Sequence, residues 1–123
     1  MISDTTFTVR AAAVEELPDL DTFGVFLAEH ADGSGRSLDI TRALAFDEQD
    51  RALGMDTYCL CSDAGPTHYG GIVRYDLSSA WLSIVLDAAA AAALGAREYR
   101  LLLAVDPALF PEILSGFQRV MAE

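Results

Sequence analysis

The spacing of apolar residues changes once within residues 99–121, YRLLLAVDPALFPEILSGFQRVM. Up to Val105 the apolar residues alternate or run together, which is typical of a central strand covered on both faces. Asp106-Pro107 then begins a helix, because proline suits the first helical position. From there apolar residues recur every three or four positions, at Phe110, Ile113, Leu114, Phe117 and Met121. This stripe predicts a C-terminal amphipathic helix lying on a sheet.

A short helix is expected upstream, over the alanine run 88–93, because alanine is the strongest helix former. Asp87 fits its N-cap and Gly95 its stop. Earlier residues follow a period of two, and the expected strands lie near 7–11, 23–27, 38–46, 57–62, 71–77 and 81–86. Strands first and helices late indicate an α+β fold, with a mainly antiparallel β-sheet of about six to seven strands, the short Ala-rich helix and the C-terminal helix packed on it.

Turn residues mark the connections between these strands. The clearest hairpin turn is ADGSG at 31–35, whose glycines accept positive φ. The strands after residue 56 are expected to form an antiparallel meander, with a loop at 63–69 and a tight Ser78-Ser79 turn. Gly70-Gly71 indicates a bulge or a close backbone approach.

The segment DEQDRALG at 47–54 is expected to form one turn of helix between two strands. Asp47 fits the N-cap, the acids of the first turn suit the helix dipole, and Gly54 fits the exit. These acids, with Asp56, lack the D-x-D-x-D-G spacing of calcium loops. A solvated turn is therefore favoured over a cation site.

Arg42 falls within an apolar row formed by Leu38, Ile40, Leu44 and Phe46. In a structural interpretation, a bulge turns the side chain out, or its stem packs while the guanidinium reaches the rim. In a functional interpretation, it pairs with an acid on a neighbouring strand and holds a recognition surface in place. The sequence leaves both interpretations open.

The 123 residues fit a single domain spanning 1–123, and 52% hydrophobic residues suffice for a core. The longest apolar stretch, 88–94, is far shorter than the roughly 20 residues of a membrane helix. The start, MISD, lacks the basic segment and apolar run of a secretory signal. We therefore expect a soluble cytoplasmic protein with no membrane partner.

The formal charge is −11, from 19 acidic residues and 8 basic residues, all of them arginine. Nucleic acids are disfavoured as partners, because binding them needs a basic footprint. Residues 1–63 hold 13 acids and 4 arginines, whereas residues 64–123 hold 6 acids and 4 arginines. The acidic half would attract a basic partner, or it simply keeps the chain soluble.

No sequence motif of a known enzyme class is present, and we expect no cofactor and no catalytic residues. His30 and His68 are expected in a turn and a loop, and neither is placed by sequence beside Ser34 or a cysteine. Cys59 and Cys61 should point to one face of a strand. Their C-x-C spacing suits neither a mutual disulfide nor a complete zinc site, so we expect reduced, metal-free thiols.

Several segments resemble the immunity protein 10 family of bacterial polymorphic toxin systems. They are LDITRAL at 38–44, FDEQD at 46–50, LGMDTYC at 53–59 and YGGI at 69–72. The Glu29-x-x-Asp32-Gly33 stretch, the 82–86 strand, Leu94-Gly95 and the amphipathic C-terminal helix are also similar. The similarity covers most of the chain after about residue 22, whereas the first 20 residues match no recognised pattern.

This resemblance implies a small, non-enzymatic cytoplasmic protein that binds and neutralises a cognate toxin domain. A toxin that attacks nucleic acids carries a basic surface, which carboxylates could cover. The candidate partner-binding residues are Asp47, Glu48, Asp50 and Asp56, with Tyr58 and Tyr69 as aromatic anchors.

Two other hypotheses remain open from the sequence. One is a small α+β enzyme or ligand-binding domain with a cleft near His68, Cys59 and Cys61. The other is a structural homo-oligomer whose acidic half only maintains solubility. A deep pocket with convergent polar groups would favour the first of these, and a broad acidic surface would favour the toxin-binding protein.

Overall fold

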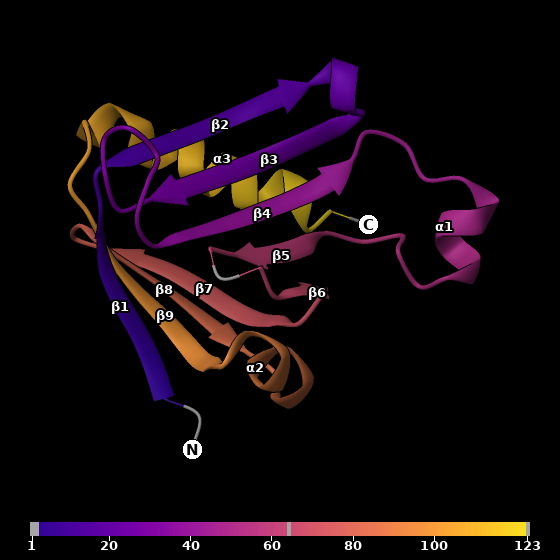
Figure 1. The fold of residues 1–123 in the computed structure, drawn as a ribbon. Coiled ribbons are helices and arrows are strands. Elements are labelled where there is room, and N and C mark those ends of the chain that lie inside the picture. The colour runs from indigo at the N-terminus through magenta and orange to yellow at the C-terminus, as the bar shows by residue number, and fades with distance from the viewer. Residues whose placement is uncertain (1–2, 64, 123) are drawn as a thin grey trace.

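A computed structural model describes residues 3–63 and 65–122 (Figure 1). Within them, nine strands form two sheets. The four-stranded sheet has the order β1 (Ser3–Val9), β9 (Ala96–Leu103), β8 (Trp81–Leu86) and β7 (Ile72–Ser78). The five-stranded sheet has the order β2 (Ala11–Leu17), β3 (Thr22–Ala28), β4 (Ser37–Ala43), β5 (Cys59–Ser62) and β6 (Thr67–Tyr69). All pairings are antiparallel except β1 with β9.

Three α-helices and two short 3-10 helices complete these parts of the chain. They are α1 (Glu48–Ala52), α2 (Ala88–Leu94), α3 (Phe110–Val120), η1 (Pro18–Leu20) and η2 (Pro107–Leu109). The α+β class is confirmed, together with the short Ala-rich helix and the amphipathic C-terminal helix. Within the described ranges, none of the helices has the length and apolar character needed to cross a bilayer.

The expectation of one sheet was wrong, because the chain changes sheets twice. The apolar alternation of residues 7–11 breaks at Arg10, so β1 joins β9 while β2 pairs with β3. The expected meander divides at Gly70-Gly71, where β5 and β6 stay in one sheet and β7 to β9 continue in the other. The loop expected at 63–69 contains β6. The strand expected over 38–46 ends at Ala43.

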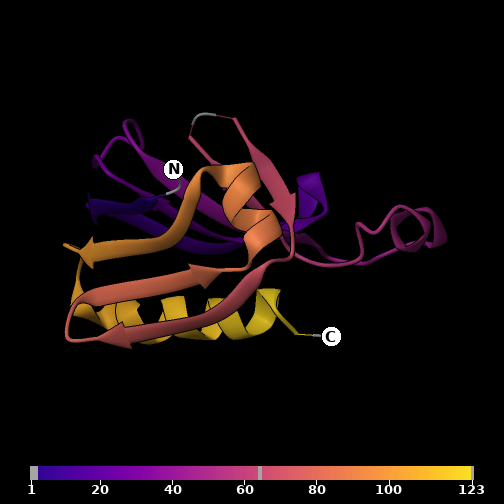
Figure 2. The same cartoon turned by 90° about the horizontal axis from the view of Figure 1, so that it is seen from below.

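Helix α3 packs on the five-stranded sheet and reaches β7 of the other sheet. Figure 1 shows it behind β2, β3 and β4, and Figure 2 shows it running alongside β7. Ile113, Gly116, Phe117 and Val120 are buried. The ring of Phe117 stacks on Tyr75 of β7, with 4.9 Å between the centroids. The predicted stripe therefore packs on a sheet through Ile113 and Phe117 and also contacts the second sheet, whereas Leu114 is only partly buried.

Local sequence signals placed the caps and turns correctly. The Asp87 side chain accepts a hydrogen bond from the Ala90 amide at the start of α2. Gly95 ends that helix at φ 78°, a conformation that glycine adopts readily. A Cβ at Gly71 would collide with Ala90, which confirms a close backbone approach there.

Arg42 has a structural role in the fold, which neither interpretation described fully. Its Nη1 lies 3.1, 3.3 and 2.6 Å from the carbonyl oxygens of Arg119, Val120 and Ala122 at the end of α3. The guanidinium also lies over the ring of Phe46, 4.8 Å from the centroid. The acidic partner of the functional interpretation is not found among the residues that the structure describes: the arginine donates to carbonyl groups at and just beyond the C-terminal end of α3, where the helix dipole also favours a cation.

Candidate functional site

The acidic turn stands away from the two sheets on a long connection between β4 and β5 (Figure 1). We call residues 44–57 the arm. Its short helix α1 has no buried residue, so it is held by local bonds and not by a core. The Asp50 amide donates to Asp47 Oδ1 at 2.7 Å, and the Asp47 amide donates to Asp50 Oδ2 at 3.1 Å. This capping box confirms the predicted helical turn and its N-cap.

The arm and the nearby strand ends enclose a hollow of about 380 Å³ on the outer side of the five-stranded sheet. Its lining includes Asp21, Thr41, Asp47, Asp50, Met55, Cys59 and Tyr69. The structure therefore gathers three of the six predicted contact residues around one hollow. Glu48 and Asp56 are exposed on the arm itself. Three carboxyl groups around an open hollow suit a positively charged side chain.

The two predicted aromatic anchors lie in different surroundings. Tyr58 is only 7% exposed, and its hydroxyl oxygen accepts a hydrogen bond from the Ile72 amide at 2.9 Å. Burial raises the pKa of Tyr58. Tyr69 is 40% exposed and lines the hollow. We therefore keep Tyr69 as a candidate anchor and assign Tyr58 to the core that links the two sheets.

Sequence reasoning missed two exposed leucines at this end of the molecule. Leu53, at the end of α1, is 62% exposed, and Leu20, in η1, is 70% exposed and lines the hollow. Leu20 directly follows Asp19, and Leu53 lies three residues after Asp50 in the segment expected to be a solvated turn. A leucine in such a turn indicates a candidate contact site, because the turn has no core against which the side chain could pack.

Cys59 and Cys61 project from the outer face of β5, as their spacing predicts. Their sulfur atoms lie 3.6 Å apart, within hydrogen-bond distance for sulfur and too far for a disulfide. The thiol of Cys59 stabilises the Cys61 thiolate, which lowers the pKa of Cys61 to about 7. The same contact raises the pKa of Cys59.

His68 lies on the opposite face of the same sheet. It pairs with Leu60, a fully buried residue, so both side chains point toward the core. The Nε2 atom of His68 is buried and has no hydrogen-bond partner among the described residues. The histidine and the two thiols therefore do not converge, and the cleft required by the enzyme hypothesis does not form between them.

The described residues do not assemble a metal site either. In residues 3–63 and 65–122, no group of three or more His, Cys, Asp or Glu side chains is close enough to share an ion. The acids of the arm use their oxygens partly for the capping box.

We expect the reaction of Cys61 with iodoacetamide to accelerate as the pH rises through about 7, because the thiolate is the reactive form. Cys59 should react more slowly. In Cys59→Ala the stabilising hydrogen bond is lost, so the pKa of Cys61 rises and its profile moves to higher pH. Peptide mass spectrometry after timed alkylation measures both rates. Identical Cys61 profiles in the two proteins would contradict the contact between the thiols.

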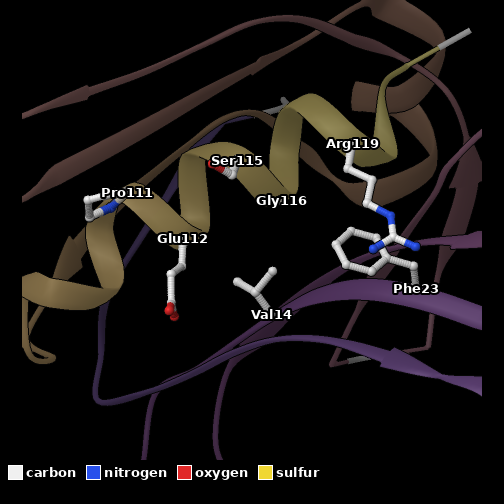
Figure 3. A pocket seen from close by; sticks show the side chains of 7 residues that line it. All are labelled: Val14, Phe23, Pro111, Glu112, Ser115, Gly116 and Arg119. Carbon is white, nitrogen blue, oxygen red and sulfur yellow. The ribbon is translucent and has the colours of Figure 1, made fainter.

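A second hollow lies on the other side of the five-stranded sheet, between β2 and α3 (Figure 3). It has a volume of about 400 Å³. Its lining consists of Val14, Phe23, Pro111, Glu112, Ser115, Gly116 and Arg119. This groove could not be predicted from the sequence, because it depends on where α3 lies relative to the edge of the sheet.

Comparison with protein-family models gives a match to the model described as Immunity protein 10, over residues 8–110. This range runs from β1 to the first residue of α3 and includes the whole arm. It also includes every numbered segment on which the sequence resemblance was based. No curated protein and no solved structure matches the chain.

Proposed function

The chain belongs to the immunity protein 10 family, and we therefore propose that it binds and neutralises a cognate bacterial toxin domain in the cytoplasm without catalysing a reaction. Binding alone suffices for this task, because an inhibitor that covers an active site excludes the substrate. The observation that best supports a contact surface is the exposure of the arm. The arm presents carboxylates on a helix that packs against no core of its own.

Charge complementarity favours a basic partner. The arm carries four carboxylates and one arginine, and the chain as a whole has a formal charge of −11. Toxin domains that act on nucleic acids need a basic surface for phosphate contact. An acidic inhibitor can occupy that surface and also accelerate its own association by electrostatic steering. We propose a toxin of this kind as the partner.

The proposed contacts divide between the rim and the hollow. Glu48 and Asp56 are exposed and form the charged rim. Tyr69 and the exposed Leu53 offer apolar area, the type of contact in which interface energy usually concentrates. The carboxylates of Asp47 and Asp50 both line the hollow and hold the arm in shape.

Co-expression with candidate toxin domains encoded beside this gene tests the proposal. We expect cells that produce the toxin to survive only when this chain is present, and the two purified proteins to form a complex. Death in the presence of well-expressed, folded chain would contradict neutralisation. Neutralisation without a complex would contradict a binding mechanism.

We expect Glu48→Arg combined with Asp56→Arg to slow association with a basic toxin several-fold at low ionic strength. The difference should shrink as salt screens the field. Asp50 is left unchanged, because its carboxylate completes the capping box. Stopped-flow association rates across a salt series measure the effect.

The matched control is Asp4→Arg combined with Asp76→Arg, which changes the net charge equally on the four-stranded sheet. If the two double variants slow association alike, the charge effect belongs to the whole molecule and the arm is not the contact. Equal thermal unfolding midpoints of the variants establish that folding is unchanged.

A further inference from the structure

Strand β2 offers an unpaired edge to solvent. It pairs with β3 along all seven of its residues, and no other strand in the described parts of the chain lies on its other side. Its sequence, AAAVEEL, contains no proline, lysine or bulge, which are the common means of protecting an edge. The charged side chains of Glu15 and Glu16 protect only the C-terminal end of this strand. A regular, free edge is a template for an added strand.

The groove beside this edge supplies the second half of a peptide-binding site (Figure 3). Gly116 brings α3 close to the sheet, because a Cβ there would lie 2.7 Å from Val25 Cγ2 and 2.9 Å from Val14 Cγ1. The neighbouring Ser115 is small and exposed, so the groove stays open. A strand edge flanked by a helix, with a groove between them, is an arrangement by which proteins bind extended segments.

We propose that an extended segment of the cognate toxin adds to the β2 edge as a sixth strand and places a side chain in the groove between β2 and α3. This inference rests on the proposed function and specifies how the partner is held. Backbone hydrogen bonds along the edge would supply affinity. Alternate side chains of the added strand would face the groove and supply specificity.

The lining of the groove indicates which segment fits. Val14 and Gly116 form an apolar floor that suits an aliphatic side chain. Glu112 forms no ion pair with any residue that the structure describes, so it is available to a basic side chain. Arg119 is already engaged, 3.3 Å from Glu16 and 4.0 Å above the Phe23 ring. The groove therefore favours a segment with one aliphatic and one basic residue on the same face.

The β2 edge is continuous with the arm surface. The strand leads directly into η1, and Leu20 and Asp21 line the hollow beneath the arm. A single partner seated at the hollow can therefore reach the edge as well. The net charge of −11 also disfavours a second copy of this chain as the occupant, because like charges repel.

Hydrogen exchange of the free chain and of its complex with the neighbouring toxin domain tests the inference. We expect amides of β2 to exchange more slowly in the complex, while those of β7, one of the two edge strands of the other sheet, stay unchanged. A stable complex with unprotected β2 amides would overturn strand addition while leaving the proposed function intact. Absence of any complex would overturn both.

A groove-filling variant provides an independent measurement. Ser115→Trp should weaken toxin binding by about tenfold or more, because the indole occupies the space for the partner's side chain. Gln118→Trp places the same bulk at an exposed position of α3 outside the groove and should bind normally. Equal affinities of the two variants, with equal unfolding midpoints, would overturn the inference.

Discussion

Replacing Phe117 with alanine is expected to lower the free energy of unfolding by about 3–5 kcal/mol, the range typical of buried phenylalanine truncations. Phe117 is fully buried, and its ring stacks on Tyr75 with an interplanar angle of 22°. It lies on the helix that packs on the five-stranded sheet and contacts β7 of the other sheet, so its loss leaves a cavity that both sheets border. Urea denaturation followed by circular dichroism measures the change.

The control for this variant is Gln118→Ala, one position along the same helix. Gln118 is exposed, and alanine has the higher helix propensity, so stability should change by no more than about 0.5 kcal/mol. Similar losses in the two variants would mean that α3 is not docked through Phe117. A large change in the denaturant slope would instead indicate an altered unfolded or native state.

Local chemistry predicted the helix ends well. The caps were predictable because each acts on backbone groups only a few residues away. This holds for Asp47, Asp87 and Gly95. The apolar stripe of α3 could also be predicted from the sequence, because an amphipathic helix must bury one face. The sequence could not show that β1 and β2 belong to different sheets. Alternation identifies the buried face of a strand but not the strand that pairs with it.

For the candidate site too, local features could be predicted from the sequence and features that depend on tertiary packing could not. An acidic turn could be predicted, since its composition excludes a core position. The sequence did not distinguish Tyr58 from Tyr69, because exposure depends on which surfaces cover each ring. Tyr58 reaches the Ile72 amide across the gap between the sheets, whereas Tyr69 lies on the outer face beside the hollow. The groove between β2 and α3 was missed for the same reason.

Replacing Arg42 with methionine is expected to destabilise the fold by about 1.5–3 kcal/mol, the range for hydrogen bonds from charged groups. Methionine preserves much of the apolar stem but cannot donate to the carbonyl groups of Arg119, Val120 and Ala122. The favourable interaction of a cation with the end of the helix dipole is lost as well. Chemical denaturation measures the loss, and Arg74→Met, at an exposed position of β7, removes the same charge as a control.

The location of the damage distinguishes this role from a general loss of charge. Hydrogen exchange should accelerate in the last turn of α3 in Arg42→Met and remain unchanged there in Arg74→Met. Arg42→Lys should be intermediate, because lysine keeps the charge but its ammonium cannot lie flat over the ring of Phe46 as the guanidinium does. Arg119 lines the groove and Arg42 lines the hollow beneath the arm. Loss of this one contact should therefore loosen both proposed binding surfaces, and unchanged exchange in α3 would show that the helix end is held by its apolar contacts alone.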